Sequence, residues 1–164
     1  MMTNRSNITY RPCQPTDAQA ISDFLLTIGD ELTIRDECEA AEMIALLFAK
    51  GGMLGAYREE QLIGVLGYFF GEPACDYANR EIGFIYLAAL AKPYRLSRVF
   101  QNALFYAFQF LRELGVQRCA FMHGNMTAIS IASMRALPSR YAKRLIVGAI
   151  PVSSTAKYCK HLPL

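Results

Sequence analysis

The feature that most constrains the fold is an apolar run followed by one long amphipathic helix pattern. Residues 82–90 read IGFIYLAAL, without a charged side chain, and Lys92-Pro93 stops the run. Such a run is typical of a central strand that is buried on both faces. The pattern of residues 97–114 predicts a helix that ends at Gly115, and residues 116–122 return to a strand pattern. Because a strand, a helix and a strand in this order form a βαβ unit, we expect the two strands to be parallel.

The helix of residues 97–114 has a clear core-facing stripe. Its apolar residues recur at helical spacing, at Phe100, Leu104, Ala107, Phe108 and Leu111. Phe105, Tyr106 and Phe110 add apolar surface around the sides, so we expect this helix to be heavily packed.

Before this unit, the pattern predicts a strand, two helices and a hairpin. Pro15 opens the first helix, with Thr16 as a candidate cap and Gly29 as its end, and the second helix starts at Asp36. The expected elements are a strand at 8–12, helices at 15–28 and 36–50, and hairpin strands at 53–57 and 62–70. The hairpin makes the predicted sheet mixed.

After the βαβ unit, the pattern predicts a helix at 127–137, a strand at 145–152 and an edge strand at 157–161. We find no repeat, low-complexity tract or linker that would divide the chain. A chain of 164 residues is long enough to close one core, so we expect a single domain over residues 1–164.

Composition excludes several classes of protein. The chain is 53% hydrophobic and 19% charged, which argues against disorder and a coiled coil. The longest nearly apolar stretch, residues 82–91, is too short to span a membrane, and residues 1–12 lack the apolar segment of a signal peptide. The net charge of +3 comes without a long basic cluster, which makes nucleic acid an unexpected partner. We therefore expect a cytoplasmic protein that has no membrane contact.

The cysteine and histidine content argues against a metal site. Five cysteines lie tens of residues apart without a C-x-x-C motif, and the chain has two histidines. This pattern fits neither a disulfide framework nor zinc ligation, so we expect reduced thiols and no bound metal.

Four segments resemble the GNAT superfamily of acyl-CoA-dependent N-acyltransferases, in the order that this superfamily uses. "ITYRPCQPTDAQAISDFL" (8–25) resembles its opening strand and helix, and "MLGAYREEQLIGVLGYFF" (53–70) resembles its hairpin. "IYLAALAKPYRLSRVFQNAL" (85–104) is similar to its central strand and cofactor-binding helix, and "NMTAISIASM" (125–134) to its Asn-x-x-Ala-Ile segment. The resemblance implies an α/β (mixed α+β) fold with a mostly antiparallel sheet, a central parallel βαβ unit and helices on both faces.

The resemblance also implies a site for acetyl-CoA or another acyl-CoA. In the superfamily, helix-start amides in an Arg/Gln-x-x-Gly-x-Gly/Ala motif hold the pyrophosphate, and the pantetheine arm pairs with the end of the central strand. Arg95 takes the first motif position, whereas Arg98 and Phe100 stand at the two small-residue positions. Arg98 either blocks close phosphate approach or pairs with phosphate, and Phe100 belongs to the core stripe and could face inward. The implied cofactor-binding residues are Leu87, Ala88, Ala89, Leu90, Arg95, Leu96, Ser97, Arg98, Val99 and Asn125.

Acyl transfer to an amine requires a base for the amine and an acid for the leaving thiolate. The strand end that often carries the base, residues 87–90, has no titratable side chain here, so Glu81 at the other end would act through water. The tyrosine that often protonates the thiolate aligns with Ala132, beside Ser133. His123 has a titration range suited to proton transfer, with an exposed loop histidine as the alternative. The catalytic candidates are His123, Glu81 and Ser133.

Three hypotheses on function remain open from the sequence. The first is an N-acyltransferase with a CoA thioester donor and an unidentified amine acceptor. The acidic residues between positions 30 and 42 would border the acceptor site, either attracting a cationic amine or forming a solvated surface. The second is a catalytically degenerate binding or assembly module of the same fold, for which a homodimer through the hairpin or the C-terminal strand is one arrangement. The third is an unrelated mixed α/β binding domain.

Overall fold

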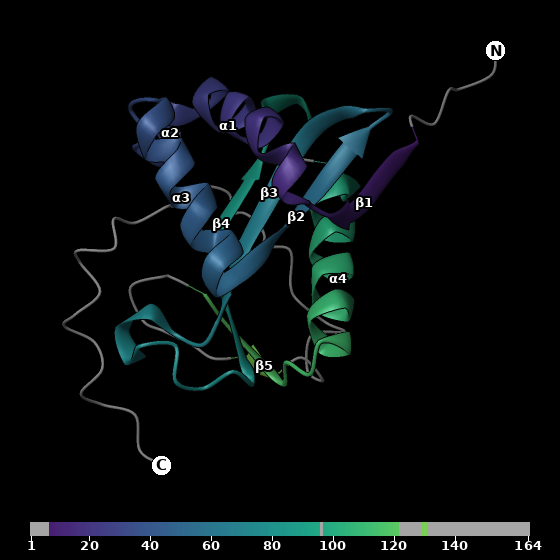
Figure 1. Cartoon of the computed structure of the whole chain (residues 1–164). Helices are drawn as coiled ribbons and strands as arrows, with labels where there is room; N and C mark the ends of the chain where they lie inside the picture. Colours follow the sequence, from purple (N-terminus) through teal and green to yellow (C-terminus); the bar gives the residue numbers. More distant parts are fainter. Residues whose placement is uncertain (1–6, 96, 122–128, 131–164) are drawn as a thin grey trace.

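The computed structural model describes residues 7–95, 97–121 and 129–130, which form a mixed sheet flanked by helices (Figure 1). Within these residues, the sheet has six strands in the order β1-β2-β3-β4-β5-β6. The strands are β1 (Ile8–Pro12), β2 (Gly51–Arg58), β3 (Gln61–Phe70), β4 (Ile82–Leu90), β5 (Arg118–Phe121) and β6 (Ile129–Ser130). The α-helices are α1 (Ala18–Thr27), α2 (Gly29–Leu32), α3 (Glu37–Lys50) and α4 (Arg98–Glu113), and short 3₁₀ turns cover Pro15–Asp17, Pro73–Cys75 and Lys92–Tyr94.

The predicted βαβ unit is confirmed. β4 and β5 are parallel, with Ile82 opposite Arg118 and Ile85 opposite Phe121, and α4 connects them. Every other neighbouring pair in the sheet is antiparallel. The fold class expected from the resemblance, a mostly antiparallel mixed sheet with one central parallel pair, is therefore correct.

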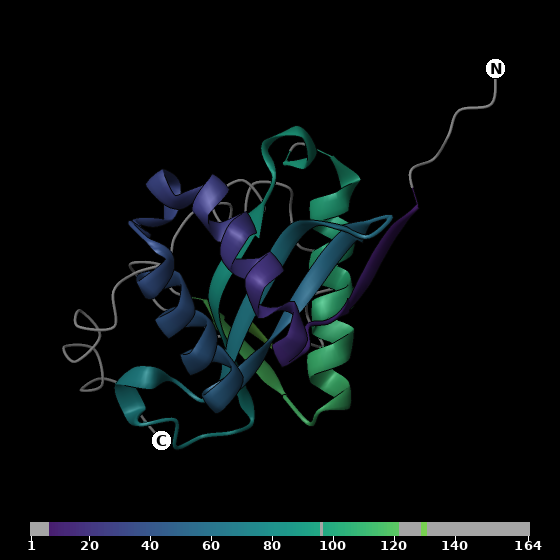
Figure 2. The same ribbon diagram turned by 45° about the horizontal axis from the view of Figure 1, so that its top comes forward.

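Helices cover both faces of the sheet, as Figures 1 and 2 show from two directions. Met53, Val65 and Phe84 point toward the side of α1, α2 and α3, while their neighbours along each strand point toward α4. The two cores alternate in this way because successive side chains of a strand point to opposite faces. β4 contributes to both cores and is buried from Gly83 to Leu90.

Helix α4 follows its predicted stripe. Its buried residues are the expected Phe100, Leu104, Ala107, Phe108 and Leu111, and Ser97 is its N-cap. The expectation of heavy packing on all sides is wrong at Phe105, whose side chain is 60% exposed. This residue lies outside the stripe, where no strand of the described sheet covers it.

The start of α1 differs from its prediction. Thr16 is not the cap: a 3₁₀ turn begins after Gln14, and the Asp17 carboxylate accepts the Gln14 amide at 2.7 Å. The Asp17 carboxylate also accepts hydrogen bonds from both terminal nitrogens of Arg11, at 2.8 and 3.0 Å. α1 ends at Thr27 with Ile28 as its C-cap, so Gly29, the predicted end, instead begins the short helix α2, which ends at Thr33 with φ 58°. The predicted cap of α3 is confirmed, since Asp36 accepts from the Glu39 amide.

The predicted helix over 127–137 is wrong at residues 129 and 130. These residues form β6, in which Ile129 pairs with Cys119 and Ser130 with Arg118. Pairing with the outer edge of β5 satisfies backbone groups that a helix at this position would leave open. The rest of that segment and the predicted strands at 145–152 and 157–161 lie outside the described residues.

Three further observations concern cysteines, metal ligands and membrane spans. Cys13, Cys38 and Cys119 are free thiols as expected, whereas Cys75 is disulfide-bonded, which corrects the expectation for that residue. Within the described ranges, no group of three metal-ligating side chains occurs. The helices of this part of the chain also include none that is long and apolar enough to cross a membrane.

The Asp17–Arg11 pair predicts a specific acid dependence of stability. The hydrogen bonds from Arg11, followed by the bond from Gln14, lower the pKa of Asp17 to about 2. A carboxyl with a lowered pKa stabilises the fold above its unfolded pKa of about 4, and this contribution disappears as pH falls toward 2. Asp17→Asn should therefore lower the free energy of unfolding by roughly 1–2 kcal/mol at pH 7.

Urea unfolding of both proteins between pH 7 and pH 2 measures this difference. The gap between wild type and Asp17→Asn should close as pH falls, and Asp30→Asn at an exposed position of α2 is the control. A gap that stays constant across this pH range would contradict the assignment.

Candidate cofactor-binding site

The middle of β4 contains a β-bulge. Gly67 of β3 pairs with Leu87, whereas the next β3 residue, Tyr68, pairs with Ile85, so Tyr86 is an extra residue in β4. As a result, Tyr86 and Leu87 both point into the core on the α1–α3 side, although they are adjacent in sequence. Bulges redirect side chains and backbone groups and are frequent beside active sites.

Beyond the bulge, β4 is paired with β3 on one side. Leu87–Leu90 pair with residues 64–67, while the described part of β5 ends opposite Ile85. The side chains of Leu87, Ala88, Ala89 and Leu90 are at most 9% exposed. These four predicted pantetheine contacts therefore offer their backbone rather than their side chains.

A tight turn leads from β4 into α4. The Ser97 hydroxyl donates to the Tyr94 carbonyl at 2.6 Å and accepts the Val99 amide at 3.2 Å. The amides of Arg98 and Phe100 have no carbonyl within the helix to which they can donate, because they belong to its first turn. Ser97, Arg98 and Val99 thus lie together at the start of α4, and Leu96 lies outside the described residues.

Arg98 places a positive charge at the positive end of the helix dipole. Its side chain is exposed, and no ion pair of the described residues includes it. Lys92, whose side chain is 75% exposed, lies in the preceding 3₁₀ turn and faces the Glu31 carboxylate. Free amides, the dipole and the charge of Arg98 together favour an anion at this helix start.

Phe100 points inward, as its place in the core stripe predicts. It is 7% exposed and packs with Leu90 and Leu104 under α4. Its bulk therefore lies beneath the helix rather than on the exposed side of the first turn. The large residue at this motif position does not cover the helix amides from outside.

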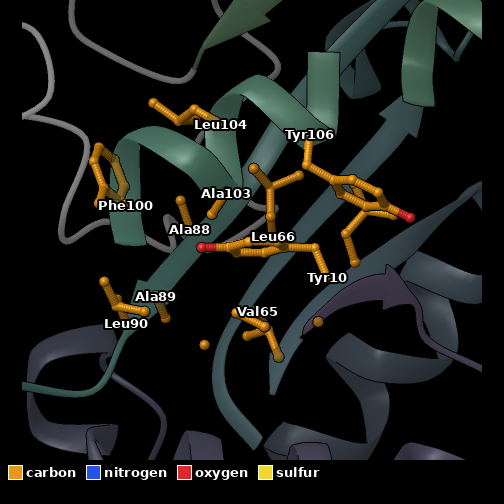
Figure 3. Close-up of a pocket in the computed structure, with 14 residues that line it drawn as sticks. Tyr10, Val65, Leu66, Ala88, Ala89, Leu90, Phe100, Ala103, Leu104 and Tyr106 are labelled. Atoms are coloured by element: carbon orange, nitrogen blue, oxygen red, sulfur yellow. The ribbon is translucent and has the colours of Figure 1, made fainter. Parts of the chain in front are cut away.

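A cavity of about 40 Å³ lies beneath the first half of α4 (Figure 3). Its walls come from β1 to β4 and from α4, and they include Tyr10, Leu66, Ala88, Phe100, Ala103 and Tyr106. Tyr10 closes one side, with its hydroxyl donating to the Val99 carbonyl at 3.2 Å. A drug-sized ligand needs a pocket of roughly 300 Å³ or more, so this apolar space is a packing cavity and not a pantetheine channel.

Arg95 differs from the other predicted phosphate contacts because its side chain is engaged inside the protein. Its Nε donates to the Leu90 carbonyl at 2.8 Å, and its terminal nitrogens donate to the Glu31 carboxylate at 2.7 and 3.2 Å. Lys92 lies 3.6 Å from the same carboxylate. The hydrogen bond from Arg95 is the main reason that the pKa of Glu31 lies below its usual range.

Of the three catalytic candidates, Glu81 lies in the described part. It precedes β4, where its carbonyl accepts the Gln117 amide at 2.8 Å and its Oε1 accepts from the Gln117 side chain at 3.3 Å. A strand rises about 3.3 Å per residue, so the nine steps from Glu81 to Leu90 separate these residues by roughly 30 Å. The structure therefore brings Leu87–Leu90 and the start of α4 together but places Glu81 at the opposite end. His123, Ser133 and Asn125 lie outside the described residues.

Sequence reasoning missed two features of this site. The bulge at Tyr86 leaves no trace in an apolar run, because both faces of β4 are buried. The Glu31–Arg95 pair joins residues 64 positions apart. Glu31 was noted as part of an acidic stretch, but no local pattern identifies its partner.

Comparisons with known proteins agree with this architecture. By sequence, no protein-family model and no curated protein matches this chain. Among solved structures, a GNAT family acetyltransferase from Brucella melitensis in complex with acetyl-CoA is similar, with a TM-score of 0.61, 13% identity and coverage of 82% of this chain and 93% of that chain. The GNAT family N-acetyltransferase YhbS from Escherichia coli, in complex with CoA, has a TM-score of 0.57, 17% identity and coverage of 74% and 65%.

A third similar structure is the diaminobutyrate acetyltransferase EctA from Paenibacillus lautus in complex with L-2,4-diaminobutyric acid and coenzyme A. Its TM-score is 0.51, with 19% identity and coverage of 71% of this chain and 65% of that chain. The chain has the GNAT fold, as the four sequence segments indicated.

Phe100 provides a test of how α4 is anchored over the sheet. Phe100→Ala should lower the free energy of unfolding by about 3–5 kcal/mol, because it removes a buried ring and enlarges the existing cavity. Phe105→Ala on the same helix is the matched control and should change it by less than about 1 kcal/mol, since that ring is 60% exposed. Urea unfolding at neutral pH measures both values, and equal losses would contradict the inward orientation of Phe100.

Proposed function

We propose that this protein is an acyl-CoA-dependent N-acyltransferase, which transfers an acetyl or other short acyl group to an amine of a small molecule or protein. The observation that carries the proposal is the combination of the β4 bulge with an anion-favouring start of α4, within a GNAT fold. Structures of this fold crystallised with acetyl-CoA or CoA support it. The sequence-based expectation of a cytoplasmic location stays a prediction.

The start of α4 would bind the pyrophosphate of the acyl-CoA substrate. The amides of Arg98 and Phe100 and the exposed Arg98 guanidinium are the groups that favour an anion there. The backbone of Leu87–Leu90 would hold the pantetheine arm, as β4 has no described partner on the β5 side beyond Ile85. Leu96 and Asn125 remain proposed contacts of the same substrate.

In the proposed reaction, the amine nitrogen forms a bond to the thioester carbonyl carbon, the carbon–sulfur bond breaks, and the amine proton passes to solvent or a base while the thiolate gains a proton. Residues 87–90 have no titratable side chain that could serve as base. Positioning of the amine against the thioester would therefore supply much of the acceleration. His123 and Ser133 remain proposed proton-transfer groups, and Glu81 could act only over the length of β4.

The acidic stretch bears on the acceptor. Three of its carboxylates have partners within the protein: Glu31 binds Arg95, Asp36 caps α3 and Glu39 pairs with Arg35. Paired or capping carboxylates attract a distant cation less than free ones do. This arrangement favours a structural role for much of the stretch, so an amine of any charge remains compatible with the proposal.

The alternative is a degenerate GNAT-fold module that binds a partner, including a second copy of itself, without catalysis. Arg98 at a small-residue position and Ala132 at the position of the superfamily's tyrosine favour this alternative. It differs from the enzyme in two measurable properties: it does not turn over acetyl-CoA, and it has no need to bind CoA.

Calorimetric titration with acetyl-CoA and with free CoA tests the proposal. We expect saturable micromolar binding, and we expect Arg98→Ala to weaken it by roughly 1–2 kcal/mol through loss of a charged hydrogen bond that solvent partly screens. Arg112→Ala, in the last turn of the same helix, is the matched control and should leave the affinity unchanged. Release of free CoA thiol from acetyl-CoA with pooled amines then tests catalysis.

The absence of binding at millimolar CoA would contradict the enzyme and leave the binding module as the leading function. Equal effects of Arg98→Ala and Arg112→Ala would contradict the proposed phosphate position.

A further inference from the structure

The turn between β4 and α4 is tied to α2 by a side-chain pair, which we call the clasp: Glu31, Arg95 and the Leu90 carbonyl. Arg95 donates through both terminal nitrogens to Glu31 and through Nε to Leu90. Its side chain is 17% exposed, and that of Glu31 is 26% exposed. The clasp therefore joins the last residue of β4, the turn after it and the helix that follows α1.

The geometry of Arg95 argues against a direct role in phosphate binding. A guanidinium has five N–H groups in a fixed plane, and the clasp uses three of them. The carboxylate of Glu31 also offsets the positive charge of Arg95. A phosphate in this position would compete with an anion that the protein itself provides.

The turn itself has few other supports. Its backbone forms single hydrogen bonds between neighbours, with Tyr94, Arg95 and Ser97 donating three residues back, at 2.9, 3.3 and 3.2 Å. From outside the turn, Arg58 at the hairpin donates to the Tyr94 hydroxyl at 3.0 Å, at an exposed position. At the two ends of this segment, the Ala91 amide donates to the Ile63 carbonyl and the Tyr10 hydroxyl donates to the Val99 carbonyl. Between them, the clasp is the partly buried side-chain contact that reaches the turn itself from another element.

We propose that Glu31 is a positioning residue that, through Arg95, holds the amides at the start of α4 in place for the pyrophosphate of acyl-CoA. This inference rests on the proposed function and adds which residues hold the phosphate-binding amides in position. Glu31 acts on the turn without touching the substrate, and Arg98 supplies the charge that the phosphate meets.

A double-mutant cycle tests the clasp. Glu31→Gln, Arg95→Gln and the double variant are titrated with CoA, and we expect each single change to weaken binding roughly three- to thirtyfold, as loss of a charged hydrogen bond does. The double variant should bind no more weakly than the weaker single variant, because one interaction is lost in all three. If Arg95 contacted phosphate directly, Glu31→Gln would instead leave CoA affinity unchanged or increase it, which would overturn the proposal.

Hydrogen exchange without ligand measures the positioning itself. The amides of residues 94–100 should exchange faster in Glu31→Gln than in wild type, and Glu31→Asp should restore part of the protection. Glu39→Gln is the matched control, because Glu39 also pairs with an arginine but at the exposed start of α3. Equal melting temperatures establish that the variants remain folded.

The two measurements separate the two proposals. If the wild type does not bind CoA but the amides of Glu31→Gln exchange faster, the proposed function is overturned and the clasp is retained as the support of the turn. CoA binding by wild type with unchanged exchange and affinity in Glu31→Gln would overturn the clasp and retain the function.

Discussion

The burial of β4 on both faces is the constraint on which the rest of the structure depends. One face of this strand closes the core under α1 to α3, and the other closes the core under α4. Because β4 pairs antiparallel with β3 and parallel with β5, it also joins the hairpin to the βαβ unit. The same strand carries the bulge at Tyr86 and leads into the turn before α4, so packing and site geometry have one origin.

Much of this arrangement could be predicted from sequence, since the determining signals are local. The stripe of α4 repeats at helical spacing over about three turns, and each predicted stripe residue is buried. Prediction fails where a local helix signal competes with strand pairing. Ile129 and Ser130 lie in a segment with helix-forming neighbours, yet they form a strand that pairs with the edge of β5. The prediction of Thr16 as a cap fails for a related reason, because Asp17 accepts hydrogen bonds from Arg11 and from the Gln14 amide and thereby sets the start of the turn.

The candidate site was less predictable than the fold because its side chains are positioned by contacts between residues that are distant in the sequence. The resemblance implied that Arg95, at the first motif position, contacts phosphate, and it left open whether Arg98 blocks phosphate or pairs with it. The structure separates them: Arg95 is held by Glu31 and Leu90, whereas Arg98 is exposed. A one-dimensional pattern cannot distinguish a guanidinium that a carboxylate already binds from one that faces solvent.

This division of roles also explains how the site can tolerate its unusual residues. Small residues at a phosphate-binding helix start serve to let the anion reach the amides. Phe100 does not oppose that approach, because its ring fills space beneath α4. Arg98 is exposed, and in the proposed site its charge would favour the anion at the positive end of the helix dipole. In the proposed site, the amides at the start of α4 and the Arg98 guanidinium would bind the anion together, and the amides depend on the fixed position of the turn that the clasp provides.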